Sequence, residues 1–83
     1  MAVDVETIRQ LPKVDSVEWI KPGQVISDID YQSLRDLLQS RKRMTLIGKN
    51  GCVIIASIKE ELLIIQTQPN VNIGSIDLIL DSI

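Results

Sequence analysis

The sequence predicts a single α/β domain of the α+β kind, in which helices pack on one antiparallel sheet of about five strands. Length is the first reason, because 83 residues suffice for one hydrophobic core. The second is a series of β-branched runs separated by tight turns over residues 44–68. The third is helical spacing of apolar residues near residues 31–42 and 73–83. The expected element order is α-β-β-α-β-β-β-α.

The N-terminal segment predicts a short helix over residues 5–11. Asp4 is placed to cap it. Pro12 ends it, because the residue before a proline is pushed out of the α region. Its apolar side chains fall near one face: Val5, Ile8 and Leu11.

A β-hairpin is predicted next. Residues 14–20 have strand composition, with Val17 and Trp19 on one side. Lys21-Pro22-Gly23 predicts the turn, because Pro fixes φ at one central position and Gly accepts a positive φ at the next. Residues 24–27 are then expected to form a short returning strand.

The second helix is predicted to begin at Asp28 or Asp30, either of which can cap it, and to run to about Lys42. Its apolar residues form a narrow stripe: Tyr31, Leu34, Leu37 and Leu38. Cations crowd its expected C-terminus, where they would complement the helix dipole: Arg41, Lys42 and Arg43.

Residues 44–68 predict a three-strand meander. Asn50-Gly51 separates strands over residues 44–49 and 52–58, and this dipeptide predicts a type I′ turn with positive φ at both positions. Lys59-Glu60-Glu61 turns the chain into a strand over residues 62–68. Its continuous apolar run predicts burial on both faces, and Pro69 stops it.

The last segment, after a Pro-Asn-Val-Asn-Ile-Gly bend, is interpreted as a short apolar helix. Its apolar residues repeat at helical spacing: Ile73, Ile76, Ile79 or Leu80, and Ile83. The alternation of Ile76, Leu78 and Leu80 also fits a strand, so both readings stay open.

Composition argues against most kinds of chemistry. The chain has no His, one Cys and only 2% aromatic residues, so it lacks the commonest general base and cannot form an intramolecular disulfide. A net charge of −2 disfavours generic binding to nucleic acid or to anionic membranes. The start of the chain also lacks the basic and apolar regions of a signal peptide. We therefore expect a soluble cytoplasmic domain that is not an enzyme and holds no cofactor or metal.

Local motifs have simple structural interpretations. Cys52 has no histidine to activate it and is expected to be a structural thiol. Gly48-Lys49-Asn50-Gly51 joins two strands, whereas a phosphate-binding loop joins a strand to a helix. Two acidic pairs fit a helix start and a hairpin tip: Asp28 with Asp30, and Glu60 with Glu61.

One feature does point to function. The strand over residues 43–49 can lie at a sheet edge beside the apolar second helix. Proteins usually cover or pair such an edge. Pairing with a second copy of the chain is the simplest remedy for a small domain. We therefore expect a dimer.

The element order and the residues together resemble the Roadblock/dynein light chain family of small profilin-like domains. The likeness is clearest over residues 43–83, where three strands and Gln68-Pro69-Asn70-Val71-Asn72-Ile73-Gly74 lead into a final helix. The opening Ile8-Arg9-Gln10-Leu11-Pro12-Lys13-Val14 is similar to the family's first helix and its Leu-Pro-x-Val lead into the first strand. The chain is shorter than most members, chiefly between Ser27 and Arg43.

The resemblance implies a non-enzymatic homodimer, or a heterodimer with a related subunit. Such a dimer regulates or scaffolds a small Ras-like GTPase, or serves a motor or signalling complex. It also implies that the second helices of two subunits pack together while the adjacent strands join into one sheet. By position, the interface residues would be Tyr31, Leu34, Leu37, Leu38, Arg41, Met44, Leu46 and Gly48. On this reading Leu38→Asp separates the subunits more cleanly than Ile64→Asp.

Two alternatives from other classes stay open. One is a dimeric nucleic-acid-binding protein that uses the basic residues of the second helix: Arg35, Arg41, Lys42 and Arg43. The other is a small-molecule sensor with a pocket between sheet and helix, although few polar or aromatic residues are available to orient a ligand. An enzyme is the least supported class.

Overall fold

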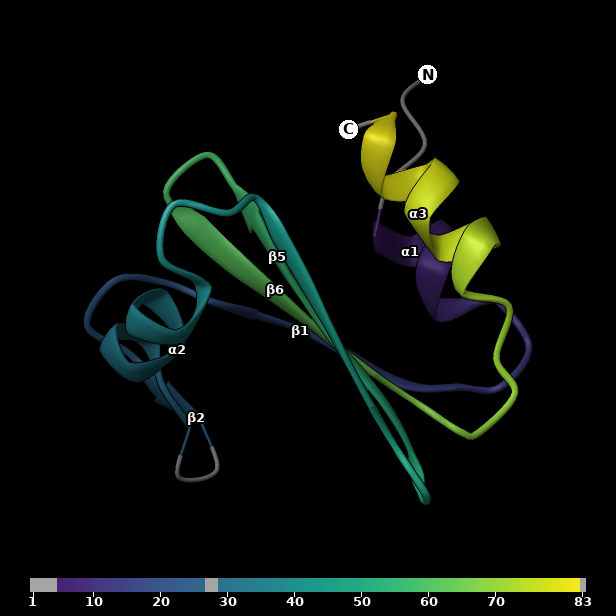
Figure 1. Ribbon diagram of the computed structural model, residues 1–83. Coiled ribbons are helices and arrows are strands. Elements are labelled where there is room, and N and C mark those ends of the chain that lie inside the picture. The colour runs from purple at the N-terminus through teal and green to yellow at the C-terminus, as the bar shows by residue number, and fades with distance from the viewer. Residues whose placement is uncertain (1–4, 27–28, 83) are drawn as a thin grey trace.

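A computed structural model describes residues 5–26 and 29–82 (Figure 1). The elements in chain order are α1 (Val5–Arg9), β1 (Val14–Ile20), β2 (Val25–Ile26), β3 (Ile29–Asp30), α2 (Tyr31–Leu38), β4 (Arg43–Gly48), β5 (Gly51–Ile58), β6 (Glu61–Thr67) and α3 (Ile73–Asp81). The chain is thus a small α+β domain, as the sequence predicts. None of the described helices is long and apolar enough to cross a bilayer.

The main sheet has four antiparallel strands in the order β1-β6-β5-β4, and β2 and β3 form a separate two-stranded ribbon. The expected fifth strand therefore does not return along β1. The Lys21–Gln24 turn closes as expected, with a φ of +82° at Gly23 and a bond from the Gln24 amide to the Lys21 carbonyl. The Gln24 carbonyl, however, accepts from the Tyr31 amide at 3.1 Å, which directs this segment to the start of α2.

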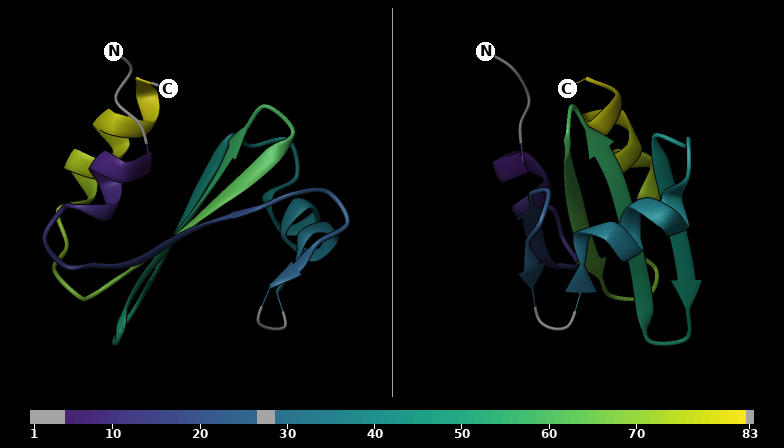
Figure 2. Two further views of the ribbon diagram at one scale, coloured as in Figure 1. Left: turned by 180° about the vertical axis from the view of Figure 1, so that it is seen from behind. Right: turned by 90° about the vertical axis from the view of Figure 1, so that its left-hand side faces the viewer.

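The sheet is covered on both faces. Figures 1 and 2 show α1 and α3 on one face and α2 with the β2–β3 ribbon on the other. The central strand β6 serves both cores, because Leu63 and Ile65 face α1 and α3 while Leu62 and Ile64 face α2. All four side chains are buried, which confirms the prediction that this strand is covered on both sides.

The first helix is shorter than expected, ending at Arg9 rather than Leu11. Ile8 is fully buried, and Val5 and Leu11 pack on the same core, so the predicted apolar face is confirmed. Asp4, its predicted cap, lies outside the described residues.

The second helix ends four residues before Lys42. Asp30 caps it, accepting a hydrogen bond from the Gln32 amide, whereas the alternative cap Asp28 lies outside the described residues. The helix stops where Gln39 adopts a positive φ of 58°. Residues 39–42 have no apolar side chain, so a longer helix would bury nothing against the sheet. The prediction that Arg41, Lys42 and Arg43 lie at the C-terminus of this helix is therefore wrong.

The hairpin between β4 and β5 forms, but with a different turn from the one predicted. Gly48 pairs with Gly51, so Lys49 and Asn50 are the central residues, and neither has a positive φ. Gly51 lies in β5 with a φ of +146°, and a Cβ there would come 2.0 Å from the Thr67 carbonyl oxygen. Glycine is thus needed for close strand packing, not for a type I′ turn.

The last segment is a helix, which resolves the ambiguity in its pattern. Asn72 caps it by accepting a hydrogen bond from the Ser75 amide at 3.1 Å. Ile76 and Leu80 are buried, while Leu78 is 70% exposed, as helical rather than alternating geometry requires. Ile83 lies outside the described residues.

Candidate interaction surface

The strand β4 forms one edge of the main sheet. It pairs regularly with β5 and with no other described strand. The Ser57 amide donates to the Lys42 carbonyl at 2.8 Å, so the backbone groups of Lys42 point toward β5. In an antiparallel pair the residues of one strand point their backbone groups alternately toward and away from the partner strand. The backbone groups of Arg43, Thr45 and Ile47 therefore point to the free edge. This edge can accept another strand.

Two large exposed apolar side chains lie on this edge strand, and a third lies on α2. Among the described residues, the large exposed apolar side chains are Val25, Leu37, Leu46, Ile47 and Leu78. Ile47 on β4 is 75% exposed, and Leu46 and Leu37 are both nearly half exposed. The cross-strand register places Leu46 on the α2 side of the sheet and Ile47 on the α1–α3 side. Both sides of the edge are therefore apolar.

The helix stripe predicted to face a second subunit faces the chain's own core instead. Leu38 is fully buried with Ile55 and Leu62, and Tyr31 and Leu34 pack against the same cluster. An amphipathic helix buries its apolar stripe on the nearest sheet first, so Leu38 is not a surface residue. The outward apolar position of α2 is Leu37, which was also in the predicted interface.

The remaining predicted interface residues lie on or beside β4. Met44 is half-buried against the α2 core, whereas Gly48 and Arg41 are exposed. The structure thus brings Met44, Leu46 and Gly48 to one side of one edge strand. Arg41 lies in the connection before the strand and not on α2.

Arg43 joins this edge to α3 through a pair of carboxylates. Its guanidinium lies 2.9 Å from Asp77 Oδ1 and 2.5 Å from Asp81 Oδ1. Burial disfavours the guanidinium charge, but the hydrogen bonds to Asp81 and Asp77 outweigh this and raise the pKa of Arg43. No pattern in the sequence predicts this contact, because Asp77 and Asp81 lie 34 and 38 positions from Arg43 along the chain.

A second polar cluster holds α2 against the end of the β5–β6 hairpin. The Tyr31 hydroxyl donates to the Glu60 carbonyl at 2.7 Å. The Arg35 Nε donates to the Tyr31 hydroxyl at 2.8 Å, and its other arm donates to Ser57 Oγ at 2.8 Å. Tyr31 is therefore engaged within its own chain.

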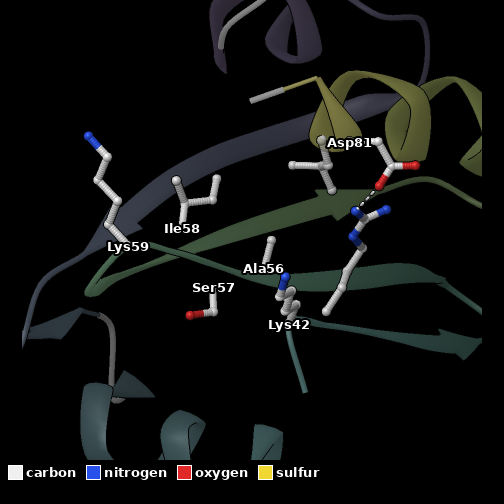
Figure 3. A pocket seen from close by; sticks show the side chains of 8 residues that line it. Lys42, Ala56, Ser57, Ile58, Lys59 and Asp81 are labelled. Carbon is white, nitrogen blue, oxygen red and sulfur yellow. Dashed lines mark hydrogen bonds and ion pairs between the residues drawn. The ribbon is translucent and has the colours of Figure 1, made fainter. Parts of the chain in front are cut away.

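An open groove of about 440 Å³ lies between the end of α3 and the adjoining ends of β4 and β5 (Figure 3). It is lined by Lys42, Arg43, Ala56, Ser57, Ile58, Lys59, Leu80 and Asp81. The groove mixes charges of both signs, and its carboxylate is already bound to Arg43. Nothing in this arrangement selects a ligand.

Other features of the described residues also bear on whether the chain holds a reactive or ligand-binding site. Cys52 is buried. No group of three or more His, Cys, Asp or Glu residues within residues 5–26 and 29–82 could hold a metal ion. In the same part of the chain every buried side-chain nitrogen and oxygen has a hydrogen-bond partner. The surface around β4 is thus the best candidate for a functional site.

Comparisons with protein-family models, with curated proteins and with solved structures found no match to this chain.

Proposed function

We propose that this chain is a non-enzymatic interaction module that pairs with a second copy of itself through β4. The observation that carries the proposal is the open β4 edge, with apolar Leu46 and Ile47 exposed on its two sides. An exposed apolar edge strand is an aggregation hazard unless another strand covers it. Self-pairing covers both the backbone groups and the side chains.

Symmetry determines where the helices would lie in such a dimer. Two identical antiparallel edge strands can be related only by a two-fold axis perpendicular to the sheet. Both copies of α2 then lie on the same face of one continuous sheet. Leu37 and Leu46, which belong to that face, would be covered by the partner copy. This is the arrangement that the Roadblock resemblance implies.

The paired α2 helices would form a platform for a protein partner, and we propose a small Ras-like GTPase or a motor or signalling complex. The support for this partner is the resemblance described above. The chain itself would supply no nucleotide site, because Gly48–Gly51 closes a hairpin between two strands. We expect capture of a GTPase from cell extract to depend on its GTP or GDP state. Stoichiometric GTP binding by the isolated chain would contradict the proposal.

The dimer is tested by light scattering coupled to size exclusion on two matched variants. Thr45→Pro removes an outward backbone donor without touching the β5 ladder, whereas Thr45→Val keeps that donor at similar volume. We expect the wild type and Thr45→Val at twice 9.3 kDa and Thr45→Pro as a folded monomer. A wild type that stays monomeric at high concentration would remove the proposal.

The nucleic-acid alternative has less support. Of its four basic residues, Arg35 is hydrogen-bonded to Tyr31 and Ser57, and Arg43 is paired with Asp77 and Asp81. Of these four residues, Arg41 and Lys42 are exposed and have no side-chain bond to another described residue. The net charge of the chain is −2, which disfavours binding to a polyanion. Steep loss of binding with added salt would be its signature.

A further inference from the structure

The Arg35 guanidinium occupies an unusual position for a cation. Arg35 belongs to α2 and is half-buried, and no carboxylate among residues 5–26 and 29–82 pairs with it. Within those residues it contacts the Tyr31 hydroxyl, the Ser57 hydroxyl and the Tyr31 ring, whose centroid lies 5.4 Å away. Tyr31 in turn donates to the Glu60 carbonyl. One side chain thus ties two turns of a helix to the end of a β-hairpin. We call this cluster of Tyr31, Arg35, Ser57 and Glu60 the α2 latch.

The latch lies on one flank of the helix, and the exposed Leu37 lies on the other. Successive helical residues turn by about 100°, so Arg35 and Leu37 are about 200° apart around the axis. Between them, Leu38 anchors the helix in the core. In this eight-residue helix Leu38 is the one fully buried side chain, and Tyr31 and Leu34 pack half-buried beside it. Contacts on the flank of the helix therefore help to set its rotation about its own axis.

We propose that Arg35 is a positioning residue, whose latch sets the roll of α2 and thereby holds Leu37 where a second copy can contact it. This inference rests on the proposed dimer. A helix with side chains has a radius of about 5–6 Å, so a roll of about 20° moves a surface side chain by about 2 Å. A shift of that size spoils a packed interface, whose fit is lost at about 1 Å.

The planar guanidinium group explains why an arginine suits this position. Its N–H donors point in fixed directions, so one guanidinium can donate to two hydroxyls on different elements at once. The contact with Tyr31 also aligns the phenol to donate onward to Glu60. Lysine would keep the charge but lose the fixed fork.

The test is a double-mutant cycle on the dimer dissociation constant, measured by sedimentation equilibrium. The variants are Arg35→Met, which keeps most of the apolar stem, Leu37→Ala and the double variant. We expect each single variant to weaken the dimer about tenfold and the double variant to weaken it about 10–20-fold, since Leu37 is already misplaced without the latch. Independent roles would instead multiply to about 100-fold. That multiplicative result would contradict the proposal that Arg35 positions Leu37.

Folding is measured separately in the Thr45→Pro monomer, where assembly does not contribute. There we expect Arg35→Met to speed hydrogen exchange of the α2 amides while the β5–β6 amides keep their protection. Arg35→Lys should behave like Arg35→Met. Full rescue by lysine, or unchanged α2 exchange, would overturn the latch. A monomeric wild type would instead overturn the proposed dimer and the latch with it, so the two failures are distinct.

Discussion

The two edge strands of the main sheet, β1 and β4, differ in their regularity and in the side chains that they expose. At β1 the register with β6 shifts between Val14 and Ser16, so Asp15 is an extra, bulged residue. The Arg9 side chain donates to the Val17 carbonyl of this strand at 2.8 Å, and Glu18 is an exposed charge. At β4 the register is regular, and the exposed side chains at the middle of the strand are apolar.

The difference indicates which edge is already protected from pairing within the monomer. Bulges, charges and side chains that occupy backbone groups are the usual ways in which proteins stop an edge from pairing. The β1 edge has all three features, whereas β4 has an apolar surface and a free backbone. A partner strand is therefore expected at β4 and not at β1.

The largest expected effect is unfolding by a charge placed in the core beneath α2, in contrast to dissociation of the dimer by a charge on the outer side of α2. Leu38→Asp should unfold the chain as fully as Ile64→Asp, because a buried charge costs several kcal/mol against a total stability of about 5–15 kcal/mol. Leu37→Asp should give a folded monomer, since its charge stays hydrated once the copies part. Circular dichroism and light scattering on the three variants provide the measurement. A folded monomer from Leu38→Asp would place that side chain at the interface after all.

A charge introduced at each edge tests the comparison itself. Leu46→Lys on β4 should weaken the dimer about 100-fold or more, because two copies of the charge would meet near the two-fold axis. Glu18→Lys introduces the same side chain on β1 and should leave the dimer mass unchanged, because that position is already charged and exposed. Light scattering over a dilution series measures both. Dissociation by Glu18→Lys would reverse the assignment of the edges.

Much of this fold follows from local patterns in the sequence. The four-residue apolar core of β6 predicted a strand covered on both faces, and Pro22-Gly23 predicted its turn. The edge position of β4 was also predictable. Each of these features depends on residues that are near neighbours along the chain or on burial of a continuous run.

The features that were missed depend on tertiary partners. Periodicity showed an apolar stripe on α2 but not that Leu38 would face its own sheet, because a stripe is the same whichever surface it meets. The end of α2 at Gln39 follows from where the chain must leave the helix to begin β4. The Arg43 ion pairs, and the contacts by which the latch reaches Ser57 and Glu60, join residues more than 20 positions apart, so no spacing rule could find them.

A smaller effect should follow when the protected edge is opened. Arg9→Met removes the donor to the Val17 carbonyl and frees that acceptor for another strand. We expect the dimer to remain but to form larger species slowly at high concentration, as a rise in scattering over hours. Combining Arg9→Met with Leu46→Lys should leave only weak association through β1. A protein that stays strictly dimeric with Arg9→Met would show that the bulge alone protects this edge.

The smallest expected effect concerns the ion pairs that tie β4 to α3. Arg43→Met removes both contacts while keeping the backbone of the edge strand intact. Because Asp77 and Asp81 are largely solvated, with side chains 42% and 66% exposed, we expect a loss of only about 1 kcal/mol or less in the free energy of unfolding. Arg41→Met, at an exposed cation two residues earlier, should change the free energy of unfolding by less than about 0.5 kcal/mol.

Urea unfolding of both variants in the Thr45→Pro monomer, at low and high salt, measures the difference in stability between Arg43→Met and Arg41→Met without a contribution from assembly. The difference should shrink as salt screens the carboxylates. If it persists at high salt, Arg43 stabilises the edge through its apolar stem and not through its charge.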